Sequence, residues 1–85
     1  KLNNFLQKKF IDKPSMKKVE ITREPVELYK ILKFEGLAST GGEAKLLVDI
    51  GAVTVNSLVE TRRRRKIVNG DVIELQGDKL LIQLV

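Results

Sequence analysis

The sequence predicts an α+β fold, in which a hairpin of two helices precedes a small antiparallel sheet. Between residues 25 and 51, apolar side chains recur with the helical period of about 3.6 residues. After Gly51 the period falls to about 2, which is typical of strands. Asn69-Gly70-Asp71 is a strong hairpin signal, and Gly77-Asp78 marks a second turn between strands.

The composition suits one small globular domain and excludes several kinds of chemistry. The 85 residues are 42% hydrophobic and 32% charged, without an apolar run near the roughly 20 residues of a membrane helix. Cysteine and histidine are absent, which rules out disulfides, Cys/His zinc sites and imidazole catalysis. The serines, lysines and carboxylates form no catalytic pattern. We therefore expect a non-enzymatic protein without metal, cofactor, small-molecule substrate or membrane partner, and, without a visible export signal, a cytoplasmic location.

Residues 1–15 differ from the rest and are predicted to be a basic extension. Leu2, Phe5, Leu6 and Phe10 fit a short amphipathic helix, which is marginal in water at this length. Met16 follows directly and is a candidate natural start, in which case residues 1–15 are a disordered or artificial addition. Residues 16–85 are predicted to form the single domain.

The first predicted strand covers residues 17–22, where Val19 and Ile21 alternate with polar residues. A helix is then predicted over 25–35, with Pro25 in its first turn and Gly36 as its stop. Phe34 is expected in the core.

The second helix is predicted to begin at Thr40, which forms a T-x-x-E capping box with Glu43, and to end at Gly51. The short connection at 36–40 makes the two helices a hairpin. Strands are predicted beyond Gly51 at residues 52–56, 58–61, 72–75 and 79–85.

Two glycines stand in the first turn of the second helix. Gly41 and Gly42 each cost about 1 kcal/mol relative to alanine in a helix interior. One interpretation is that they allow close packing. The other is that they expose backbone N–H groups to an anion such as phosphate, since the helix dipole favours negative charge there. Lys45 lies one turn further along the same face.

A second candidate binding feature is a run of four arginines and a lysine at residues 62–66, called the arginine segment below. The remainder of residues 16–85 is slightly acidic, so the arginine segment is a local positive patch. Five consecutive charges cannot form a half-buried strand, which predicts a loop, a bulge or an exposed edge. A solvated edge protected against aggregation is one interpretation. Arginine's planar fork favours another, phosphate binding or base stacking by Arg62, Arg63, Arg64, Arg65 and Lys66.

Residues 28–75 carry a spaced pattern of apolar, glycine and turn residues: Leu28, Leu32, Gly36, Ala44-Lys45, Leu47-Val48, Gly51-Ala52-Val53-Thr54-Val55-Asn56 and Gly70-Asp71-Val72-Ile73. With this pattern they resemble the small RNA-binding domain named after bacterial ribosomal protein S-four, and the stand-alone bacterial members most of all. The resemblance implies two helices packed on a small, strongly bent sheet. It also implies an RNA surface made by the second helix, its first turn and the adjacent loop.

Two departures from the family pattern matter. Many members carry Ser-Arg where this chain has Thr40-Gly41, so one expected RNA-binding arginine is missing. Our hypothesis is that the arginine segment replaces it, while Gly41 and Gly42 admit the phosphate. The last glycine of the motif is Ser57 here, a change that we do not expect to break the fold.

We therefore expect a small monomeric, non-catalytic bacterial protein that binds structured RNA, ribosomal or transfer, and can associate with the ribosome. Lys45 and the arginine segment would contact phosphates, Thr40 would present the helix start, and Asn56 would hold its turn or reach a sugar. One alternative is a protein-interaction module that docks an acidic or ribosome-associated partner. Another is the RNA-binding appendage of a larger enzyme, against which Met16 as a start and a closing strand at Val85 favour a complete small protein.

Overall fold

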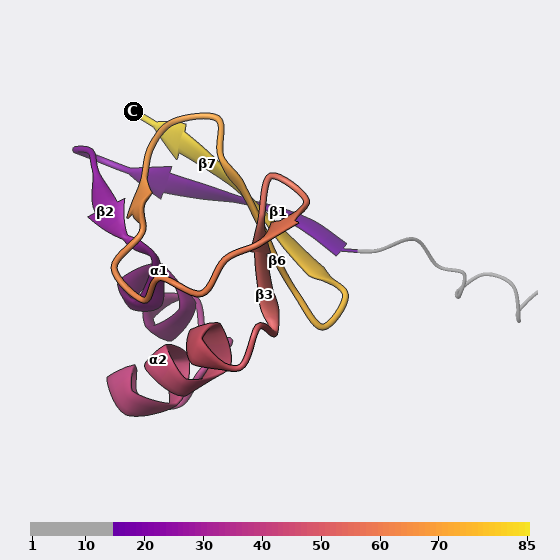
Figure 1. The fold of residues 1–85 in the computed structure, drawn as a ribbon. Helices are drawn as coiled ribbons and strands as arrows, with labels where there is room; N and C mark the ends of the chain where they lie inside the picture. Colours follow the sequence, from indigo (N-terminus) through magenta and orange to yellow (C-terminus); the bar gives the residue numbers. More distant parts are fainter. Residues whose placement is uncertain (1–14) are drawn as a thin grey trace, which may run out of the picture.

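The computed structural model describes residues 15–85, which form two helices and two sheets (Figure 1). The predicted basic extension and its amphipathic helix lie outside the described residues, apart from Ser15. In chain order the elements are β1 (Ser15–Ile21), β2 (Val26–Glu27), α1 (Leu28–Phe34), α2 (Gly41–Asp49), β3 (Val53–Val55), β4 (Leu58–Val59), β5 (Lys66–Ile67), β6 (Val72–Leu75) and β7 (Asp78–Leu84).

The main sheet has five strands in the order β1-β7-β6-β3-β4, and β2 pairs with β5 in a separate two-stranded ribbon. The α+β class and the helix hairpin are confirmed. The sheet is mixed rather than wholly antiparallel, because β1 runs parallel to β7 along seven paired positions. The other pairings are antiparallel. The N-terminal strand enters at the edge and pairs with the last strand of the chain, so no hairpin constrains its direction.

The core fills the space between the helices and one face of the sheet. On α1, Leu28, Ile31 and Leu32 are buried, which is the i, i+3, i+4 stripe of an amphipathic helix. On α2, the buried residues are Ala44 and Val48, which are spaced i, i+4. Alternate strand residues close the core from the other side, as the strand period requires: Val19, Ile21, Val53, Val55, Ile73, Leu75, Leu80 and Ile82.

The first helix is shorter than predicted, and one of its residues was misplaced. Val26–Glu27 pair with β5, so the chain is extended there and α1 begins only at Leu28. Phe34 was expected in the core but is 71% exposed. It lies about 160° around the helix from Leu32 and about 60° from Ile31, so it stands at the edge of the buried stripe, where its ring is exposed.

The turn between β3 and β4 carries conformational strain at Ser57. Asn56 and Ser57 both have positive φ angles, of 53° and 72°. Asparagine tolerates this region, whereas serine pays a steric cost that glycine avoids. We expect Ser57→Gly to raise the free energy of unfolding by about 0.5–1 kcal/mol, measured by urea denaturation. The control is Ser57→Ala, and an alanine variant as stable as the glycine variant would show that strain at residue 57 is negligible.

Candidate nucleic-acid interface

Thr40 caps the start of α2 as the sequence predicts, but the second half of the capping box does not form, because the Glu43 carboxylate reaches the N–H of Ser39 and not that of Thr40. The Thr40 hydroxyl accepts a hydrogen bond of 3.0 Å from the backbone N–H of Glu43, and the Glu43 carboxylate accepts one of 2.6 Å from the N–H of Ser39. Within residues 15–85, no partner is found for the N–H groups of Gly41 and Gly42. The helix start therefore keeps two backbone donors at its positive end, although Glu43 places one negative charge beside them.

Neither glycine is needed for packing. A Cβ atom at Gly41 would lie 3.8 Å from Cε2 of Tyr29, and one at Gly42 would lie 3.8 Å from Oγ1 of Thr40. Both distances are ordinary van der Waals contacts, and neither residue has a positive φ. Close packing thus gives no reason for glycine at these two positions.

Tyr29 brings the start of α2 together with the arginine segment. Nζ of Lys45 lies 4.7 Å from the centre of the Tyr29 ring, and Cζ of Arg64 lies 5.2 Å from it. An N–H of Arg64 also donates to the Tyr29 hydroxyl at 3.4 Å. The aromatic ring attracts both cations, so it holds two like charges close to one another.

The backbone of the arginine segment is fixed against the start of α1. The first helical N–H groups, of Leu28 and Tyr29, donate to the carbonyl oxygens of Arg65 and Arg63 at 2.9 and 3.1 Å. These carbonyls replace a side-chain cap, because Glu27 at the N-cap position makes no side-chain cap bond. Figure 1 shows the segment that leads into β5 passing beside the start of α1. Of the three predicted forms, loop, bulge or exposed edge, residues 62–65 adopt the loop, and Lys66 begins β5.

Glu60 holds this loop in place through hydrogen bonds to two of its arginines. Its buried carboxylate accepts from the backbone N–H and the guanidinium of Arg62 at 2.8–2.9 Å, and from Arg65 at 2.7 Å. The hydrogen bonds from Arg62 lower the pKa of Glu60 from 4.5 to about 2, against the opposing effect of desolvation. The pKa of Arg62 is raised by the same pair.

The other two arginines contact one acidic side chain of α2 and one of β2. Arg63 makes a two-pronged pair with Asp49 of α2 at 2.8 and 2.9 Å, and its hydrogen bonds lower the pKa of that exposed carboxyl. Arg64 reaches Glu27 at 3.1 Å. The segment thus presents five cations against three contacting carboxylates, which leaves it net positive.

A basic hollow of about 350 Å³ opens on the arginine segment, lined by Arg62, Arg64, Arg65 and Lys66. Among the described residues, Lys66 has no ion pair, and each arginine retains N–H donors that no protein acceptor uses. These unused donors and the Lys66 ammonium remain available to bind an added anion. Arg64 belongs both to this hollow and to the cluster around Tyr29, so it connects the arginine segment to the side chains beside the start of α2.

Asn56 makes its side-chain hydrogen bonds to Asp71 and Val72, at the start of β6, and not to the arginine segment. Its amide nitrogen donates to Asp71 at 3.0 Å, and its amide oxygen accepts from the N–H of Val72 at 2.9 Å. Asp71 in turn accepts from the N–H of Val68 at 2.9 Å. Of the two roles predicted for Asn56, the geometry matches that of holding the turn.

The sequence reasoning missed two residues that build the surface. The sequence pattern assigns no role to Tyr29 or to Glu60. A weak signal existed for Glu60, since an acid two residues before an arginine run can fold back on it. The position of Tyr29 against Gly41 and Lys45 depends on how the two helices cross, which no local pattern encodes.

Comparison with known proteins identifies the family. The model of the S4 domain matches residues 19–83, almost all of the described chain. The chain belongs to the S4 domain family. Within this S4 domain, the match covers the whole surface described above.

Two curated relatives are similar to this S4 domain. "Putative RNA-binding protein YbcJ" of Escherichia coli is 40% identical over 57 residues, which cover 67% of this chain and 81% of the relative. "Probable ribosome maturation protein RlbA" of Bacillus subtilis is 36% identical over 59 residues, 69% of this chain and 83% of the relative. The solution structure of YbcJ, reported to reveal an "alfaL" motif involved in RNA-binding, superposes with a TM-score of 0.60 at 32% identity, covering 86% of this chain and 91% of that one.

Across residues 15–85, no helix is long and apolar enough to cross a membrane. In the same range, no three acidic side chains gather in a way that could hold a metal ion.

Proposed function

We propose that this protein is a monomeric, non-catalytic RNA-binding domain that holds structured RNA by its phosphates. The proposed binding surface consists of the first turn of α2 with Lys45, the ring of Tyr29 and the basic hollow on the arginine segment. The relatives named for RNA binding and for ribosome maturation support RNA as the ligand, and ribosomal RNA as its class.

The observation that carries this proposal is the position of Arg64. Its guanidinium lies against Tyr29 beside Lys45 and also lines the hollow with Arg62, Arg65 and Lys66. A phosphate chain that follows this surface meets cations along its length and two backbone donors at Gly41 and Gly42. The absence of a packing reason for these glycines favours anion contact over the steric interpretation.

The members of the surface have different proposed roles. Lys45, Arg62, Arg64 and Lys66 contact phosphates directly, while Arg65 also anchors the loop on Glu60. Arg63 is held by both oxygens of Asp49 and chiefly fixes the loop to α2. Thr40 caps and presents the helix start, and Asn56 holds the β3–β4 turn rather than a sugar.

A salt titration tests the electrostatic mechanism. With about four phosphate contacts, the logarithm of the association constant should fall with the logarithm of salt concentration with a slope near −3, an affinity loss of about 50- to 100-fold between 50 and 200 mM salt. Fluorescence anisotropy with a labelled ribosomal RNA hairpin measures it.

The same assay distinguishes the class of ligand. A transfer RNA and a DNA hairpin of the same sequence serve as comparisons, and the ribosomal hairpin should bind most tightly. Affinity that does not change with salt would contradict phosphate binding. Failure to bind any of the three nucleic acids at 50 mM salt would reject RNA binding itself.

A further inference from the structure

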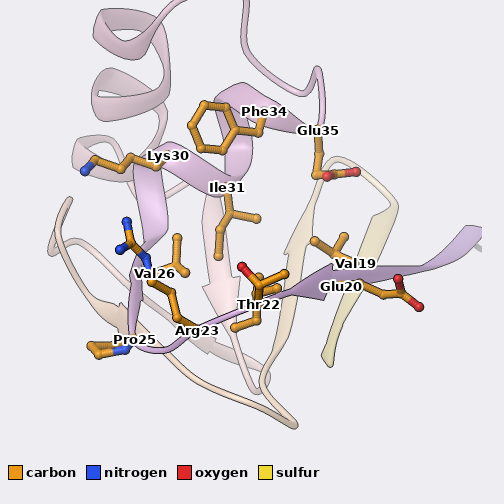
Figure 2. A pocket seen from close by; sticks show the side chains of 11 residues that line it. Val19, Glu20, Thr22, Arg23, Pro25, Val26, Lys30, Ile31, Phe34 and Glu35 are labelled. Carbon is orange, nitrogen blue, oxygen red and sulfur yellow. The ribbon is translucent and has the colours of Figure 1, made fainter. Parts of the chain in front are cut away.

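A second hollow lies away from the arginine segment, between the end of β1 and α1 (Figure 2). Its volume is about 490 Å³, within the range of about 300–1,000 Å³ common for ligand pockets. Nothing in the sequence pattern pointed to it, because its walls come from the strand, from residues 22–26 and from the helix. It is called the α1–β1 hollow below.

The floor of the α1–β1 hollow is apolar, and its rim carries an aromatic ring. Val19, Val26 and Ile31 line it, and Figure 2 shows the Ile31 side chain pointing from α1 into the space. Phe34, one helical turn further on, lines the same hollow with 71% of its surface exposed. An exposed ring above an aliphatic floor offers a planar ligand contacts on two sides.

The charges of the α1–β1 hollow are divided between its ends. Figure 2 places Arg23 and Lys30 at one end, and Glu20 and Glu35 at the other. Glu35 is paired with Lys17 at 3.0 Å. Within residues 15–85, Arg23 has no ion-pair partner. The hollow therefore suits a ligand with an apolar planar part and an anionic group at one end.

The cationic end of the hollow is connected to the arginine segment by Glu27, whose carboxylate contacts one cation of each. One oxygen of that carboxylate contacts both Nζ of Lys30, at 3.6 Å, and a guanidinium nitrogen of Arg64, at 3.1 Å. A nucleic-acid strand on the arginine segment thus lies next to the entrance at Lys30.

We infer that the α1–β1 hollow takes one unpaired nucleotide of the bound RNA, with its base between Phe34 and the aliphatic floor and its phosphate at Arg23 and Lys30. This inference rests on the proposed function and adds a specificity to it. Bases within a duplex remain stacked and cannot enter, whereas a bulged base is free to stack on an aromatic side chain. The protein would then prefer RNA helices interrupted by an unpaired nucleotide.

The test compares two short RNA duplexes that differ only by one bulged nucleotide, with 2-aminopurine at the bulge. Wild type should bind the bulged duplex about tenfold more tightly than the plain one, and the 2-aminopurine fluorescence should change on binding. Phe34→Ala should remove this preference and the fluorescence change, while its affinity for the plain duplex stays within about twofold of wild type. Arg23→Gln should reduce the preference about threefold.

Controls separate the inference from the proposed function. Phe34→Trp should keep the preference, since it retains a stacking surface, and Leu58→Ala truncates a comparably exposed apolar residue elsewhere and should change nothing. Equal binding of both duplexes by wild type, or an unchanged preference in Phe34→Ala, would overturn the nucleotide site and leave phosphate binding intact. Loss of binding to both duplexes in the wild type would instead reject the proposed function.

Discussion

We expect the double variant Lys45→Ser/Arg64→Ser to bind structured RNA about 30-fold more weakly than wild type at low salt. These two cations flank the Tyr29 ring and connect the start of α2 to the basic hollow. Losing both should also make the salt slope shallower by about 1.5, as expected for two phosphate contacts. Anisotropy titrations at several salt concentrations give both quantities.

The matched control for this variant removes the same charge elsewhere. Lys18→Ser/Lys33→Ser changes two exposed lysines of β1 and α1 that line neither hollow. It should lower affinity by less than about threefold, through the net charge alone. If both double variants weakened RNA binding equally, the long-range charge of the domain, and no defined surface, would account for binding.

Replacing Glu60 should destabilise the domain more than replacing any residue of the arginine segment. Glu60→Gln keeps the shape of the side chain but loses the charge that holds Arg62 and Arg65. Because the carboxylate is buried and hydrogen-bonded to charged groups, we expect a loss of about 2 kcal/mol in the free energy of unfolding. Asp49→Asn, which disrupts one exposed pair, should lower the free energy of unfolding much less than Glu60→Gln does.

The same substitution should change how stability depends on pH. The pKa of Glu60 is about 2 in the folded protein and near 4.5 without its partners. A carboxyl with a lowered folded pKa stabilises the fold above its unfolded pKa, and this contribution is lost as pH falls from about 4.5 towards 2. Urea midpoints measured from pH 7 to pH 2.5 should therefore fall less steeply for Glu60→Gln than for wild type. Parallel curves would show that Glu60 carries no such linkage.

Local patterns predicted most of the elements but not the direction of the first strand. The Thr40 cap and the α2 stripe with Ala44 and Val48 are confirmed because they depend on neighbours within one or two turns. The parallel pairing of β1 with β7 joins segments more than fifty residues apart, and alternation specifies a strand without its partner or direction. Phe34 was misread because apolar character alone does not fix the side of a helix.

The candidate surface was predictable by residue type and not by arrangement. Gly41, Lys45 and the arginine segment were identified from charge and helix geometry, and the fold brings them together. Which acid pairs with which arginine follows from the path of the chain. Glu27, Asp49 and Glu60 lie on three different segments, so no spacing rule selects them.

The carbonyl groups of Arg63 and Arg65 cap α1, which means that the loop cannot move without exposing the first N–H groups of that helix. The backbone that carries the guanidinium groups is therefore fixed before a ligand binds. A preorganised surface loses little conformational entropy on association, so the affinity of each phosphate contact is not offset by the ordering of a flexible loop. Binding should then proceed at rates limited mainly by electrostatically steered diffusion, with nearly identical backbones in the free and bound states.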